Sequence, residues 1–175
     1  MKKILFTAVC LCTLMFMGTA FAQSENKLSD AEVASVAVIA NQIDIDYASL
    51  ALKKTKNEDV KQFAETMSRD HKSVIKQATD LVTRLKVTPK ENPVGRQMQT
   101  DAEKTMKMLE SKSGDAFNLA YIDNEVAYHK AVINAVETVL IPESENAELK
   151  KLLQDILPAL RAHLGHAEML QKQLK

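Results

Sequence analysis

The chain has 175 residues, of which 46% are apolar and 26% charged, so it can bury the core of one domain and is not of disordered composition. With only 4 Gly and 4 Pro, the composition favours helices over sheets. The 23 basic and 23 acidic residues balance, which leaves no basic field for a nucleic-acid partner.

Residues 1–22 have the features of an export signal. Two lysines precede an apolar run over 4–17, and Ala20-Phe21-Ala22 is a small-x-small cleavage site, so we expect the mature chain to begin at Gln23. This apolar run is shorter than a membrane-spanning helix normally requires. We expect a periplasmic protein with no stable membrane span after cleavage; the alternative is a chain anchored by an uncleaved N-terminal segment.

The 2 cysteines of the chain, Cys10 and Cys12, both lie within this signal. The mature part therefore offers no disulfide and no thiolate metal ligand. Residues 23–175 are expected to form a single domain held together by its core.

The first two predicted helices form a hairpin. Ser29 and Glu32 have the spacing of a capping box, and apolar residues then recur with a helical period to about Lys56. Asn57 is a suitable cap for a second helix, which ends before Pro89. Because the turn between them is short, the two helices should pack antiparallel.

A segment of different character, 86–114, follows and carries a short amphipathic helix over about 96–110. A third long helix is predicted from 115 to about 140 and, after a turn at Pro142 and Ser144, a fourth over 146–174. Pro158 should kink the fourth helix.

Two helical hairpins joined by a long crossover indicate an all-α fold: an antiparallel four-helix bundle, ferritin-like, whose crossover carries a short extra helix. A meandering five-helix bundle is the alternative.

Polar side chains that can bind metal lie on the apolar stripes of the four long helices. They are Asp44 on the first, His71 on the second, Glu125 and His129 on the third, and His163 on the fourth, with His166 three residues further. Asp44 and His71 are equally far from the first turn. His129 and His163 differ by about 9 Å in height along the second hairpin at 1.5 Å per residue, so one site shared by all four helices is not assured.

Inward Asp, Glu and His side chains on facing helices can build a metal site, and this donor set suits zinc, iron or copper. The di-iron oxidase pattern is not present, because Ser68, Val126 and Leu160 stand where a Glu should lie three residues before each histidine. Two further interpretations remain open. The same residues can be hydrogen-bonded pairs of the core, or a sensor of pH.

Several segments resemble the family called domain of unknown function 4142. The resemblance lies in 44–54, 60–71, Gly114-Asp115-Ala116-Phe117 with Tyr121, His129-Lys130-Ala131-Val132, and 157–164. It implies an exported protein with a ferritin-like fold, acidic residues at Asp44 and Asp46, and histidines at 71, 129 and 163. The resemblance brings no activity with it.

The function favoured from sequence is a non-catalytic envelope or stress-related interaction module, with a protein partner or a second copy as its unidentified partner. The alternative is a bundle that binds a divalent metal ion or small ligand through Asp44, His71, Glu125, His129 and His163. An enzyme is the least favoured of the three.

Overall fold

The computed structural model describes residues 27–175; the export signal and cleavage site predicted for residues 1–22 lie outside the described residues. Its elements are α1 (Asp30–Lys54), α2 (Glu58–Arg84), α3 (Pro93–Glu110), α4 (Gly114–Ala135), the π-helical turn η1 (Val136–Leu140), α5 (Ile141–Glu143) and α6 (Ala147–Leu174). No strand occurs among residues 27–175. The predicted all-α helical bundle is therefore confirmed.

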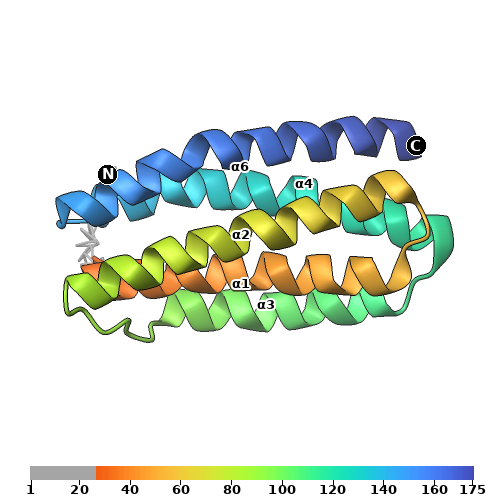
Figure 1. Ribbon diagram of the computed structural model, residues 1–175. Helices are drawn as coiled ribbons and strands as arrows, with labels where there is room; N and C mark the ends of the chain where they lie inside the picture. The colour runs from red at the N-terminus through yellow and green to blue at the C-terminus, as the bar shows by residue number, and fades with distance from the viewer. Residues whose placement is uncertain (1–26) are drawn as a thin grey trace, which may run out of the picture.

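The four long helices form two antiparallel hairpins, α1 with α2 and α4 with α6 (Figure 1). Between the hairpins, α3 returns along the length of the bundle beside α1, so that α2 and α4 run in the same direction. This is the crossover with an extra helix that the sequence predicted. It brings one face of every long helix to a common interior.

Side-chain caps fix where the helices begin. The Asn57 Oδ1 accepts the Val60 N–H at 3.1 Å, and Asn146 Oδ1 accepts two N–H groups of the first turn of α6. At the start of α1, Glu32 accepts the backbone N–H of Ser29 at 3.0 Å. Each contact satisfies a donor that the helix geometry leaves without a partner.

The third long helix extends further than predicted. It continues from α4 through η1 and α5 to Glu143, so Pro142 lies within its last turn rather than after it. The Ile141 N–H bonds the Val136 carbonyl five residues back, which widens the helix just before Pro142. In a regular α-helix the ring of Pro142 would clash with the carbonyl four residues earlier, and the wider turn directly before it makes room for that ring.

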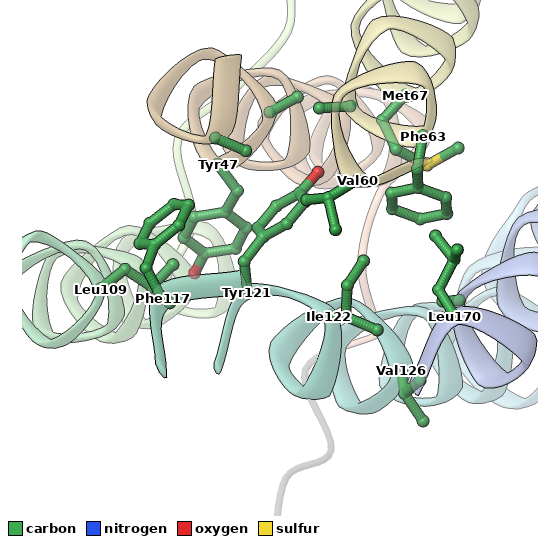
Figure 2. Close-up of a cluster of buried hydrophobic side chains, with 14 of the residues drawn as sticks. Tyr47, Val60, Phe63, Met67, Leu109, Phe117, Tyr121, Ile122, Val126 and Leu170 are labelled. Carbon is green, nitrogen blue, oxygen red and sulfur yellow. The ribbon is translucent and has the colours of Figure 1, made fainter. Parts of the chain in front are cut away.

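Aromatic and aliphatic side chains fill one half of the interior (Figure 2). Phe63 from α2 packs against Tyr121 from α4, with ring centroids 6.2 Å apart, and Tyr121 stacks on Phe117. Leu170 from α6 packs in the same cluster. A second apolar cluster, which includes Val33, occupies the other half of the bundle.

Within the part of the chain that the structure describes, no helix combines the length and hydropathy needed to cross a membrane.

Candidate metal centre

The bundle brings together all five predicted ligands in its interior. Asp44 comes from α1, His71 from α2, Glu125 and His129 from α4, and His163 from α6. Their exposed fractions are between 0 and 7%, so the group is enclosed by the four helices. We call these five residues the core cluster.

The predicted difference in height between His129 and His163 was wrong. Because the third long helix continues to Glu143, His129 lies 14 residues before its end and His163 lies 16 residues after the start of α6 at Ala147. Two residues of helix correspond to about 3 Å. The two rings therefore meet at one level, with centroids 5.6 Å apart.

The three imidazole rings form a nearly equilateral triangle. The centroid of His71 lies 5.8 Å from that of His129 and 5.3 Å from that of His163. One ring nitrogen from each of the three lies within 4.8 Å of the others. Such spacing suits ligands that surround a common centre.

The two carboxylates of the core cluster lie beside this triangle. Asp44 Oδ2 is 3.4 Å from His71 Nε2 and 3.7 Å from His129 Nε2. Donor atoms of Asp44, Glu125 and His129 also lie within 4.8 Å of one another. Two ligands of a tetrahedral zinc ion, each about 2.0–2.1 Å from the metal, are about 3.4 Å apart, which matches the shortest of these distances.

Each histidine has one nitrogen held by a partner outside the core cluster or by backbone. His71 Nδ1 donates to Asn41 Oδ1 at 2.7 Å, and the Asn41 amide is oriented by its own bond to the Ala37 carbonyl. His129 Nδ1 donates to the backbone carbonyl of Glu125 at 3.0 Å. These contacts place the proton on Nδ1 and leave Nε2 of both rings with a free lone pair.

His163 is held in the opposite tautomer. Its Nε2 donates to Asp70 Oδ2 at 3.0 Å, which leaves the lone pair on Nδ1. Asp70 is in turn paired with the exposed Arg69 at 2.8 Å. Metal-bound histidines characteristically donate their second N–H to a carboxylate or a carbonyl in this way.

The inner atoms of the core cluster lack hydrogen-bond partners among residues 27–175. These atoms are His71 Nε2, His129 Nε2, His163 Nδ1, both carboxylate oxygens of Asp44 and both of Glu125. All seven accept hydrogen bonds when the carboxyls are ionised. Buried polar atoms in folded proteins are nearly always paired, so this concentration requires an explanation.

Burial shifts the pKa of every titratable group in the core cluster in the direction that favours its uncharged form. It raises the pKa of Asp44 to about 8, and burial together with the nearby Asp44 charge raises the pKa of Glu125 well above its ordinary value. It lowers the pKa of His71 to about 3 and that of His129 to about 4. The histidines are therefore neutral at physiological pH and supply no cation to the two acids.

Two other residues considered from sequence lie apart from the core cluster. His166 packs edge-on against Phe63, with ring centroids 5.2 Å apart. Asp46 is exposed and bonds Gln42 at 2.8 Å. Neither belongs to the groups of potential ligands that the described residues form.

Sequence reasoning missed Asn41 and Asp70, which orient two of the histidines. Asn41 lies one helical turn before Asp44, so its place on the same face could have been read from spacing. Asp70 precedes His71 directly, and its contact with α6 depends on how the helices are rotated against each other. The spacing of residues within one helix therefore could not predict this contact.

The fold and the core cluster define the class of this protein as a four-helix bundle with buried histidines and carboxylates. The chain belongs to the family described as domain of unknown function (DUF4142), whose model matches residues 17–170. The family suspected from sequence is therefore confirmed. No curated protein and no solved structure matches the chain.

Proposed function

We propose that this protein binds one divalent transition-metal ion in the bundle core, through His71, His129, His163 and Asp44, with Glu125 as a further ligand. The observation that carries the proposal is the orientation of the three histidines. Each has its outer nitrogen occupied by a fixed partner and its inner nitrogen free, and one nitrogen of each ring lies within 4.8 Å of the others.

Charge supports the same proposal. With both carboxyls ionised and the three imidazoles neutral, the core cluster carries a charge of −2, which a divalent cation balances. Ionising two buried carboxyls without a counter-charge costs several kcal/mol, which is why their pKa values are raised in the metal-free protein. A bound cation removes that cost and uses the seven unpaired atoms at once.

The main alternative is that the same side chains are ordinary hydrogen-bonded core pairs. Protonation would turn one oxygen of each carboxyl into a donor, and the hydroxyl of Tyr121 would add a third donor, so three donors would face five remaining acceptors. The core cluster would then keep buried atoms without partners. Hydrogen bonding inside the core cluster therefore explains less of the geometry than a metal ion does.

The donor atoms of the site restrict which metal ions can bind. Imidazole nitrogen and carboxylate oxygen suit zinc, iron and copper, and the described residues contribute no thiolate that would favour a softer ion. The crossover topology is that of ferritin-like bundles, which build metal sites from inward side chains of facing helices. That this protein is related to the ferritin-like bundles is part of this proposal.

Zinc titration of metal-free protein tests the proposal. We expect one ion per chain and a higher melting temperature on binding. His163→Ala should weaken binding at least a hundredfold, while His166→Ala, a matched change three residues further along α6, should alter it less than threefold. Equal effects of the two substitutions, or no saturable binding of zinc, iron or copper, would refute the proposal.

Export to the periplasm is a second part of the proposed function. It is supported by the charged start, apolar run and small-x-small site of residues 1–22. Cell fractionation with N-terminal sequencing tests it, and a mature chain beginning at Gln23 is the expected result. Recovery of the uncleaved chain in the membrane fraction would favour the anchored alternative.

A further inference from the structure

A cavity of about 550 Å³ reaches the core cluster from the side of α3 and α4. Asp44, His71 and His129 form part of its wall. Exposed residues of α3 and α4, among them Val94 and Ala131, line it as well, so the cavity communicates with solvent. Its volume is in the range of sites that hold small organic molecules.

Most of the remaining wall is aliphatic. It includes Val36, Val132, Val136, Leu140, Leu153 and Leu160. A wall of this kind favours an apolar ligand, because covering it removes hydrocarbon surface from water. The polar groups of the core cluster occupy only one part of the surface.

Two observations restrict the polar end of the ligand. Neither Lys nor Arg lines the cavity among residues 27–175, and the one exposed carboxylate in the wall, Asp101, is already paired with Lys104 at 2.8 Å. An anionic head group would find no cationic side chain there. Asn124 also lines the cavity, and its Nδ2 lacks a partner, so it can donate to a ligand oxygen.

We propose that this cavity binds an uncharged aliphatic molecule with one hydroxyl or carbonyl oxygen, placed at the ion held by Asp44, His71 and His129. This inference rests on the proposed metal site for the position of the oxygen. The aliphatic wall holds the hydrocarbon part. The ligand oxygen competes with Glu125 for the position beyond the four ligands His71, His129, His163 and Asp44, since zinc sites can expand to five ligands. As a neutral donor, it leaves the charge balance between the ion and the two carboxylates unchanged.

Calorimetric titration of the purified protein with 1-decanol and with decanoate tests the inference, because the two probes share a tail length and differ in charge. We expect 1-decanol to bind zinc-loaded protein with a stoichiometry of one, at least tenfold more tightly than decanoate and at least tenfold more tightly than it binds metal-free protein. Equal affinities for the two probes would overturn the uncharged head. Equal affinities with and without zinc would overturn its contact with the ion.

Variants show whether the molecule occupies this cavity. Ala131→Phe and Ala135→Phe place bulk in the wall and should weaken 1-decanol binding at least tenfold, while Ala162→Phe on the exposed face of α6 should not. Zinc affinity is measured on the same samples. Intact zinc binding without saturable 1-decanol binding would overturn this inference alone, whereas loss of zinc binding in the unmodified protein would refute the metal site.

Discussion

Asp70 is half-buried at the edge of the core cluster and has no ligand atom directed into it. Its carboxylate accepts the Nε2 proton of His163 at 3.0 Å, which fixes the ring orientation and the free Nδ1. A negative partner also makes the imidazole a more basic ligand. Asp70 therefore acts on the proposed metal site through His163.

Replacing Asp70 with Asn tests that role. The amide oxygen can still accept the histidine proton, but the charge is lost, so we expect zinc affinity to fall by about tenfold or more. Isothermal titration measures the change. Asp80→Asn on the same helix, where the carboxylate pairs with exposed Lys76, is the matched control and should leave zinc affinity unaltered. A zinc affinity in Asp70→Asn equal to that of the control would contradict the role.

The five residues of the core cluster could be predicted from sequence because spacing within one helix determines which face a side chain occupies. Asp44 follows Ala40 by four residues, and His71 follows Met67 by four, so both had to lie on buried stripes. The tautomers could not be predicted. They depend on contacts such as His163 with Asp70, which join residues 93 positions apart.

At the scale of helices, starts were easier to predict than ends. Ser29 and Asn57 were identified as caps because their side chains suit that position, and each now precedes a helix. The fourth helix was predicted to begin at Asn146, which caps it one residue before its first turn. The end of the third long helix was misplaced, since proline was taken as a stop at 142. The wider turn of η1 before Pro142 let the helix continue, and Pro158 does not end α6 either.

Two glycines at contrasting places in the helices give opposite predictions. Gly114, the first residue of α4, has φ +56°, a conformation that costs an L-residue about 1–2 kcal/mol. Gly165 lies inside α6, and a Cβ there would meet nothing within 4 Å. Gly114→Ala should therefore lower the free energy of unfolding by about 1–2 kcal/mol, and Gly165→Ala should raise it by about 0.5–1 kcal/mol.

Denaturant unfolding of the two variants beside the unmodified protein measures both effects. Each change adds one methyl group, so each serves as the control for the other. A destabilised Gly165→Ala would mean that α6 needs a glycine for close packing, contrary to the open space around it.

For the whole molecule, the crossover determines which groups share the interior. Because α3 returns along the bundle, α2 and α4 run in parallel and place His71 and His129 at the same level as His163. The faces that meet Asp44 therefore carry three neutral histidines and a second acid, Glu125. None of these groups offsets the charge of an ionised Asp44 in metal-free protein.

That arrangement links stability to pH. The pKa of Asp44 is raised to about 8 in the folded state, from 3.8. The stability that the protonated Asp44 carboxyl contributes is therefore fully present below about pH 4 and is lost as pH rises through about 8. The raised pKa of Glu125 acts in the same direction. The lowered pKa values of His71 and His129 have the opposite effect, but it fades by about pH 7.5, where unfolded histidines have released nearly all their protons.

Above about pH 7.5 the two acids decide the sign. We expect the free energy of unfolding of metal-free protein to fall by about 1–2 kcal/mol between pH 7.5 and 8.5, since each carboxyl contributes at most about 1.4 kcal/mol per pH unit. Urea unfolding at a series of pH values measures it. Asp44→Asn should reduce the slope, and saturating zinc should remove it, because a bound ion keeps both carboxylates ionised in the folded state. A metal-free stability that stays level or rises over this range would show that the acids have a counter-charge in the folded protein, and the electrostatic argument for a cation would lose its basis.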